Sequence, residues 1–418
     1  KARARSLALK FEVPLPQGTD SAVNLQQACE FFTGLGEGAA IMIKALAGGG
    51  GRGMRAVSHL NELPQAFALC QSEALAAFGS EGVYVEQLIQ KPRHIEIQIM
   101  GDGQGHVVHL GERECSLQRR QQKLMEIAPS PSISASVREQ ICSAAKTLAS
   151  GLNYRGLGTF EFLLDANNNF YFLEANPRVQ VEHTVTEAIT GIDLVQSQFK
   201  IAAGTSLPQL GIHQDSITFS KGYAIQLRVN TEQQKVDGSV HPTSGVLTHF
   251  EMPSGAGIRV DTCGHVGFTT SPYYDSLLAK LIIYSDGDDF EKAIRKAQRS
   301  LRECNIEGID TNISFLKNLL QQPEVQTNNV STQYIDTHLE RLLTWVEDLP
   351  PLYISRDNTH NTHNAHSELK SHSKINQHLT DNSVLVNSPM QSVVVELCVD
   401  VNETVLKGQQ ICVLEAMK

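Results

Sequence analysis

The sequence predicts an α+β protein that is followed by a small all-β unit. Strand-like and helical segments are interleaved over residues 1–205, and a second unit, residues 206–341, begins with strands and finishes on helices. After Trp345 the composition becomes polar, and a β-branched run appears only near the end of the chain. The 418 residues suggest about three domains. A hydrophobic content of 41% and a charged content of 19% are typical of a globular chain with a large core.

Each unit shows its own periodicity. In the first unit, apolar β-rich runs predict strands at 40–44, 83–86 and 95–99, amphipathic runs predict helices at 61–78 and 136–150, and 159–174 is predicted to be a hairpin. In the second unit we expect strands at 222–230 and 257–260 and helices at 290–304 and 312–320.

The last part of the chain is predicted to be a linker and a small β-domain. Residues 342–383 are rich in Asn, His, Ser and Thr, which favours a solvated linker. His360, His363 and His366 within it have a spacing that could bind a metal, but a plain polar linker is the favoured interpretation. Residues 384–418 carry predicted strands at 393–397, 402–408 and 411–414, the first half of a β-barrel.

Charge and cysteine usage exclude several classes of protein. The formal net charge of -10 and the pI near 5.8 argue against a nucleic-acid surface. The 8 cysteines form no CxxC pair, as expected in a reducing compartment, and we expect a cytoplasmic protein. No apolar run approaches the roughly 20 residues of a membrane span.

A glycine-rich segment, residues 48–53, follows the predicted strand that ends at Lys44. It matches G-x-G-x-x-G, but Met54–Val57 predicts a strand instead of the helix that a dinucleotide fold requires, and no Gly-Lys-Ser/Thr closes a Walker loop. A hairpin lid whose backbone amides cover triphosphate oxygens fits better, with the lid region near 45–80. The alternative is a glycine-rich surface turn without a ligand.

Two glutamates in the predicted hairpin suggest a divalent-metal site. If Asp165 pairs with Phe170, Glu161 lies opposite Glu174, and two facing carboxylates repel unless a cation lies between them. Asn176, on the same face, would add a neutral oxygen, and such a set suits Mg²⁺. The alternative is a pair of solvated glutamates on an edge strand.

Arg178, Gln180 and Glu182 alternate with valines, which would place the three polar side chains on one face of an extended segment. A guanidinium, an amide and a carboxylate together could bind bicarbonate and remove its proton. A basic cluster would balance the charge of phosphate and bicarbonate, unless it is simply a solvated basic face. Its members are Arg113, Arg119, Arg120 and Lys123.

These segments resemble the biotin carboxylase component of biotin-dependent carboxylases, an ATP-grasp domain with a biotin carboxylase C-terminal domain, followed by a biotin carboxyl carrier domain. The resemblance covers about 1–340 and 384–418. It rests on KALAGGGGRGM, RHIEIQ, GERECSLQRRQQK, GTFEF, FLEANPRVQVEHTVTE, SPYYDSLLAK and the terminal EAMK.

The resemblance implies roles for individual residues. The ATP-binding positions would be Lys1, Lys44, Gly49, Gly50, Met54, Glu86, Leu88, His94, Gln118, Glu161 and Glu174. Mg²⁺ or Mn²⁺ would be held by Glu161, Glu174 and Asn176, and bicarbonate by Lys123, Arg178, Gln180, Val181 and Glu182. Arg259 would stabilise the biotin enolate, with Lys123, Arg178 and Glu182 as further catalytic residues, and Lys418 would carry covalent biotin.

The implied reaction is the ATP- and bicarbonate-dependent carboxylation of biotin. Gln121 stands where many relatives have a histidine, and Gln391-Ser392 departs from the usual carrier turn. The family's first α/β domain and the second half of the carrier are not in this sequence, so we expect a fragment that does not complete a turnover alone.

The resemblance also implies partners: a biotin protein ligase, a carboxyltransferase domain or subunit, and a second copy of the chain, with no nucleic acid and no membrane. The carboxylase–linker–carrier order favours an acyl-CoA acceptor, with a pyruvate or urea carboxylase component as the alternative. Two further alternatives are another ATP-grasp ligase and a non-catalytic biotin-carrier fragment.

Overall fold

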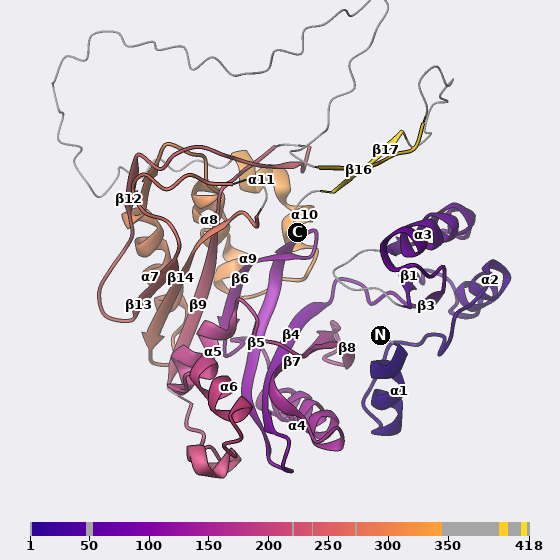
Figure 1. Cartoon of the computed structure of the whole chain (residues 1–418), viewed down its shortest axis with the longest axis horizontal. Coiled ribbons are helices and arrows are strands. Elements are labelled where there is room, and N and C mark those ends of the chain that lie inside the picture. Colours follow the sequence, from indigo (N-terminus) through magenta and orange to yellow (C-terminus); the bar gives the residue numbers. More distant parts are fainter. Residues whose placement is uncertain are drawn as a thin grey trace, which may run out of the picture.

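The computed structural model (Figure 1) describes residues 2–46, 53–219, 221–235, 237–271, 274–344, 393–399 and 411–415. Several predictions lie outside these residues: those for Lys1, Gly49, Gly50, the linker after residue 344, the strand at 402–408 and Lys418. Within the described part, no helix is long and apolar enough to cross a membrane.

One eight-stranded sheet organises the described chain, in the order β13-β14-β9-β6-β5-β4-β7-β8 with every neighbouring pair antiparallel (Figure 1). Its strands are β4 (Arg93–Asp102), β5 (Val107–Arg119), β6 (Gln122–Ala128), β7 (Arg155–Leu164), β8 (Phe170–Asn176), β9 (Gly222–Asn230), β13 (Ile258–Thr262) and β14 (Leu277–Asp286). β9, β13 and β14 come from the second predicted unit, so the large sheet contains strands from both predicted units.

A separate three-stranded sheet, β2-β1-β3, forms the small unit at the side of the large sheet (Figure 1). It contains β1 (Ile41–Ala45), β2 (Met54–Val57) and β3 (Val83–Gln87), and packs with α2 (Leu25–Gly34) and α3 (Leu63–Phe78) around a common core. β1 and β2 pair antiparallel with Lys44 opposite Met54, which confirms the predicted strand–loop–strand hairpin. A strand and not a helix follows the glycines, so the dinucleotide interpretation is excluded.

The helices cover the large sheet in two groups. α4 (Ala135–Gly151) packs against β4 and β5, and Ser134 caps its first turn by accepting from the Val137 amide. α7 (Phe290–Glu303) and α8 (Ile313–Leu320) pack over β9 and β14 in the largest core cluster. This group also holds the short helices α9 (Pro323–Gln326), α10 (Tyr334–Thr337) and α11 (Leu339–Thr344).

Three further helices contribute to the described chain. α1 (Ala2–Lys10) precedes the small unit and contacts β8. α5 (His183–Thr190) and α6 (Leu194–Ala202) come between β8 and β9 in the sequence. α5 contacts β5, β6, β9 and β14, so it crosses the centre of the sheet.

The remaining elements are short. Strands β10 (Glu232–Gln234) and β11 (Val240–Pro242) form one pair, and β12 (His249–Glu251) and β15 (Asn305–Glu307) form another. Near the C-terminus, β16 (Val393–Leu397) pairs antiparallel with β17 (Cys412–Glu415). The strand predicted at 393–397 is therefore confirmed, and the last predicted strand lies one residue further along the chain.

Candidate active site

Two of the three predicted metal ligands face each other across β7 and β8, with Glu161 opposite Glu174. The turn assumed for this pairing was wrong: Leu164, not Asp165, pairs with Phe170. A β-bulge between Glu161 and Phe162 shifts the register by one residue and restores the glutamate pair. The predicted pairing of Glu161 with Glu174 is therefore confirmed, although its derivation was off by one residue at the turn. Metal binding by this pair stays a prediction.

Asn176 lies between these two carboxylates. Its amide nitrogen donates to Glu161 Oε1 at 2.7 Å and to Glu174 Oε1 at 3.4 Å. The amide nitrogen of Asn176 thus bridges the two carboxylates. A hard cation could replace that nitrogen between the carboxylates if the Asn176 side chain turned its amide oxygen towards the cation. Two carboxylates and an amide oxygen fit Mg²⁺, which keeps its remaining positions for phosphate and water.

Glu161 is also tied to the nucleotide side of the predicted site. His94 Nε2 lies 3.0 Å from Glu161 Oε2, and Gln118 lies 3.3 Å from the other ring nitrogen of His94. Burial by itself would raise the pKa of Glu161, but His94, Lys123 and Gln180 outweigh it and lower the pKa to about 2. The carboxylate is therefore ionised at neutral pH, as a metal ligand must be.

Glu96 is a buried charged residue of the candidate site that the sequence analysis missed. It is fully buried on β4 and binds Lys123 through Oε1 and Arg113 through Oε2, the latter at 3.2 Å. A signal was present in RHIEIQ, where His94, Glu96 and Gln98 alternate with isoleucines. Both faces of this strand are buried, so its polar face has to be satisfied inside the protein.

Arg113 satisfies much of that polar face. Its guanidinium has no exposed surface and donates to Gln98, Thr159 and Thr186 at 2.8, 3.0 and 3.0 Å, besides its ion pair with Glu96. The alternative of a solvated basic face is therefore wrong for Arg113. Arg119 is also buried and pairs with Glu232 at 2.9 Å, whereas Arg120 is exposed.

Glu182 lies between two cations at the start of α5, where it occupies the N-cap position. Lys123 Nζ is 2.6 Å from Glu182 Oε1, and Arg228 Nη2 is 3.1 Å from Oε2. Burial would raise the pKa of Glu182, but Lys123, Arg228 and Arg113 together hold it far below its usual value. The carboxylate is ionised and has a lysine beside it that could also bind an anion.

Arg228 is held in place by a second buried carboxylate. Its Nε donates to Glu126 Oε1 at 2.6 Å, and the other oxygen of Glu126 accepts from Gln226 at 2.9 Å. Thr184 of α5 donates to Gln226 in turn. Glu126 and Arg228 were not predicted, because the partners are separated by about a hundred residues and neither belongs to a local pattern.

The segment between β8 and α5 is not the regular extended strand that was predicted. It bends at Arg178 and turns at Val181 and Glu182. Gln180 is buried and donates to Glu161 Oε1 at 3.0 Å, so it faces one of the predicted metal ligands. Arg178 is exposed and donates to the neighbouring carbonyl of Val179 at 3.2 Å. The bend therefore separates Arg178 from the other two members of the trio.

Several residues that are predicted to bind ATP lie on or next to the strands of the small sheet. Lys44 and Glu86 are both buried and form an ion pair across β1 and β3. The backbone amide of Leu88 donates to the Ala40 carbonyl at 2.8 Å, which fixes the strand exit that was predicted to hold adenine. Met54 begins β2 directly after the glycine-rich segment.

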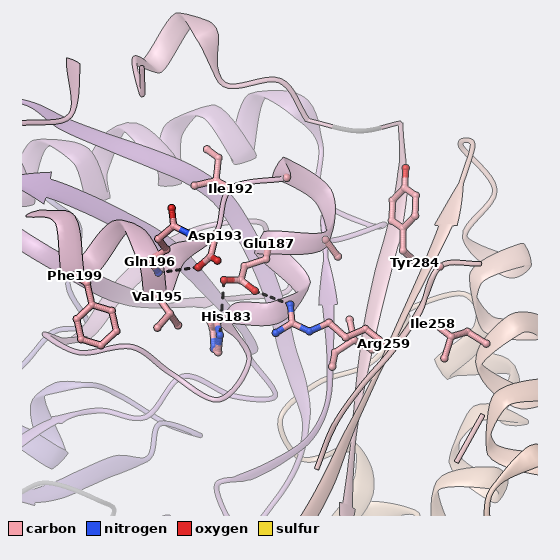
Figure 2. Close-up of a pocket in the computed structure, with 14 residues that line it drawn as sticks. His183, Glu187, Ile192, Asp193, Val195, Gln196, Phe199, Ile258, Arg259 and Tyr284 are labelled. Atoms are coloured by element: carbon pink, nitrogen blue, oxygen red, sulfur yellow. Dashed lines mark hydrogen bonds and ion pairs between the residues drawn. The ribbon is translucent and has the colours of Figure 1, made fainter. Parts of the chain in front are cut away.

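Arg259 lies on β13 at the edge of a cavity of about 870 Å³ that is also lined by α5, α6 and β14 (Figure 2). Its side chain is 48% exposed. It binds Glu187 of α5 at 2.7 Å and Asp261 at 2.8 and 3.0 Å. Figure 2 shows Glu187 between Arg259 and His183. Arg259 is thus far more exposed than Lys123 and Glu182, whose side chains are 11% and 3% exposed.

Comparison with known proteins places this geometry in a family. The carbamoyl-phosphate synthase L chain, ATP binding domain, matches residues 1–210, and the biotin carboxylase C-terminal domain matches residues 226–337. A pyruvate carboxylase from Bacillus subtilis is 48% identical over 340 residues, which are 81% of this chain but 29% of that protein.

Two further relatives are covered more fully. A biotin carboxylase from Nostoc sp. is 44% identical, over 80% of this chain and 73% of that protein. The biotin carboxylase domain of the Hydrogenobacter thermophilus 2-oxoglutarate carboxylase, solved as a dimer with MgADP, ADP and bicarbonate, is 38% identical with a TM-score of 0.77, covering 83% of this chain and 74% of that one. With an ATP-grasp fold, the C-terminal domain and this degree of identity, the chain belongs to the biotin carboxylase family, whose members are ATP-dependent ligases.

Proposed function

We propose that this chain carries out the ATP- and bicarbonate-dependent carboxylation of biotin. The observation that carries the proposal is Glu182, a buried carboxylate between Lys123 and Arg228, beside the metal-type pair Glu161 and Glu174. This arrangement combines a base, a cation for an oxyanion, and a set of oxygen ligands for a metal that binds phosphate. ATP activation of bicarbonate requires all three.

Glu161, Glu174 and Asn176 would hold Mg²⁺ or Mn²⁺. When bound, the metal supplies charge neutralisation for the phosphate oxygens. The protein's own contribution is to keep the carboxylates ionised, which His94 and Lys123 ensure for Glu161. Lys44, on the small sheet, would neutralise negative charge on the phosphates of ATP. In this structure its positive charge is balanced by Glu86.

Glu182 would remove the proton of bicarbonate. Its low pKa makes it a weak base while Lys123, Arg228 and Arg113 stabilise its ionised form. Bicarbonate binding to Lys123 would draw that cation towards the substrate and add a negative charge nearby, and both changes raise the pKa of Glu182. The deprotonated bicarbonate oxygen would then attack the γ-phosphate, giving carboxyphosphate and ADP.

Arg259 would bind the ureido oxygen of biotin and neutralise the charge that develops there. Carboxyphosphate would break down to CO₂ and phosphate, the phosphate would take the proton from the biotin nitrogen, and that nitrogen would then attack the CO₂. Lys418, the predicted site of its attachment, lies outside the described residues. The carrier half-domain, the cytoplasmic location and the biotin protein ligase therefore remain predictions from the sequence.

The direct test is Glu182→Gln in the full-length polypeptide, with free biotin as acceptor. Loss of the base should lower kcat by about 10²–10⁴-fold. ADP release that depends on both bicarbonate and biotin is the measurement, and Glu324→Gln, in an exposed ion pair with Arg341, is the matched control. Unchanged kcat in the Glu182 variant would refute the role of Glu182 as the base.

The same assay separates the alternatives. ATP turnover that needs bicarbonate but ignores biotin would favour another ATP-grasp ligase. Carboxylation by a partner that persists without Glu182 and Arg259 would favour a non-catalytic carrier.

The carboxyl acceptor is a separate question. The acyl-CoA preference rests on domain order alone, and the relatives named above act, by their names, on pyruvate and 2-oxoglutarate. Pyruvate is therefore the acceptor to test first, with an acyl-CoA and urea beside it. Transfer of labelled carboxyl groups to one of these three in the streptavidin-captured native protein would identify both the acceptor and the carboxyltransferase partner. Sedimentation of the same sample would test the predicted homo-oligomer.

A further inference from the structure

The backbone of His94 is held by a serine on the neighbouring strand β5. The register between β4 and β5 runs to the pair Ile95–Glu114, and His94 is the next residue of β4 beyond that pair. The backbone amide of His94 donates to the hydroxyl oxygen of Ser116 at 2.8 Å. Both residues are at most 5% exposed, so water has little access to this hydrogen bond. The hydroxyl of Ser116 therefore supplies a buried acceptor for β4 where its register with β5 has ended.

Glu114 determines which way the Ser116 hydroxyl points. Ser116 donates to one carboxylate oxygen of Glu114. The other oxygen accepts from Arg93 Nε and from Ser130 Oγ, each at 3.1 Å. Since a carboxylate in an ion pair with an arginine only accepts, the hydroxyl proton of Ser116 points to Glu114. The Ser116 oxygen is then free to accept from the amide of His94.

The start of β4 is fixed from the second predicted unit. The carbonyl of Pro92 accepts from the amide of Thr332 at 2.8 Å. Arg93 Nη1 donates to the carbonyl of Ser132 at 3.3 Å, and the hydroxyl of Ser132 accepts from Asn328 Nδ2 at 2.8 Å. Asn328 and Thr332 both lie between α9 and α10. The start of β4 is therefore tied to the helical group of the second unit.

The ring of His94 is held at two further points. Its Nε2 lies 3.0 Å from Glu161 Oε2, and its Nδ1 lies 3.3 Å from Gln118 Nε2. These contacts place the ring beside a predicted metal ligand, on the side where the nucleotide is expected. Backbone and ring contacts together fix the imidazole before a ligand arrives. A side chain that is fixed in advance loses little conformational entropy when it binds.

We propose that Ser116 is a positioning residue for His94, and that Glu114 and Arg93 keep the Ser116 hydroxyl in the required orientation. That the ligand beside His94 is a nucleotide rests on the function proposed above. Without the Ser116 hydroxyl, the amide of His94 loses a buried acceptor, and the start of β4 populates further conformations. ATP then has to select the competent conformation, so its apparent affinity falls in proportion to the population of that conformation.

The test is Ser116→Ala in the full-length polypeptide. Titration calorimetry measures the Kd for MgADP, and bicarbonate-dependent ADP release measures the KM for ATP. We expect both constants to rise by about 5–20-fold, the effect of one lost buried hydrogen bond. The kcat at saturating ATP should stay within about twofold, because His94 is again in place in the bound enzyme.

Ser134→Ala is the matched control. Its hydroxyl also accepts from a backbone amide, that of Val137, but it does so at the start of α4. The two variants therefore lose the same kind of hydrogen bond, and Ser134→Ala should change neither the Kd for MgADP nor the KM for ATP.

An unchanged Kd for MgADP in Ser116→Ala would overturn the proposal, and so would a loss of kcat at unchanged Kd and KM. If Ser116→Ala does not fold, Glu114→Gln decides on the same criterion, because a glutamine turns an amide N–H towards Ser116 or Arg93. An unmodified protein that binds MgADP but releases no ADP with bicarbonate would refute the proposed function, while calorimetry still decides the role of Ser116. An unmodified protein that does not bind MgADP would refute both.

Discussion

The two halves of the candidate site are built differently. On the bicarbonate side, Glu96, Arg113, Lys123 and Glu182 have side chains that are at most 11% exposed, and every charge has at least one oppositely charged partner. On the biotin side, Arg259 is 48% exposed at the rim of an open cavity. The closed half suits an intermediate that water would destroy. The open half suits a group that is delivered on another part of the protein.

Because the two halves differ in burial, substitutions in them should lower the free energy of unfolding by different amounts. We expect the largest loss for a substitution of Arg113. Arg113→Met should lower the free energy of unfolding by about 3–5 kcal/mol, because Glu96 would lose a buried partner and four polar side chains would lose a donor. Urea unfolding measures this loss. Arg341→Met breaks an exposed pair with Glu324 and should cost less than about 1 kcal/mol. Equal costs for the two variants would contradict the assignment of a closed half.

Glu182 should make the closed half sensitive to acid. Its pKa is lower in the folded protein than in the unfolded chain, so the stabilisation is present above the unfolded value of about 4.5 and is lost as the pH falls towards the folded value. A tenfold lower proton affinity of Glu182 in the folded protein than in the unfolded chain corresponds to about 1.4 kcal/mol of stability. Thermal unfolding of wild type and Glu182→Gln between pH 7 and pH 3 measures the effect: the gap between their stabilities should shrink or reverse as the pH falls. A gap independent of pH would mean that Glu182 is not held ionised by Lys123 and Arg228.

The closed half also shows which features of the site could be predicted from the sequence and which could not. The glutamate pair was predictable because both residues lie in one hairpin, and period-two patterning fixes which side chains face each other. The bulge after Glu161 was not predictable, since it depends on how the turn at Asp165 closes. Asp165 accepts from the amides of Asn167 and Asn169 and so makes the turn one residue longer than assumed.

Other parts of the site depend on contacts distant in sequence. Arg228 and Glu126 are separated by about a hundred residues and meet because β6 and β9 are neighbours in the sheet. No local pattern contains that pairing. The bend at Arg178 was missed because alternation with valines is typical of a strand, whereas Glu182 had to become the N-cap of α5. Local periodicity therefore predicted which two carboxylates face each other, whereas sheet topology determines which charged side chains lie beside them.

Arg259 should show the opposite balance between stability and activity. Arg259→Met removes contacts with Glu187 and Asp261, but the arginine is about half exposed and solvent screens these ion pairs. We expect the free energy of unfolding to fall by less than about 1 kcal/mol. This is the smallest stability effect expected among the variants of Arg113, Glu182 and Arg259. Biotin-dependent ADP release should nevertheless be lost, while bicarbonate-dependent hydrolysis without biotin persists. A cost as large as that of Arg113→Met would show that Arg259 serves the fold instead, because an exposed arginine whose ion pairs are screened by solvent contributes little to the stability of the fold.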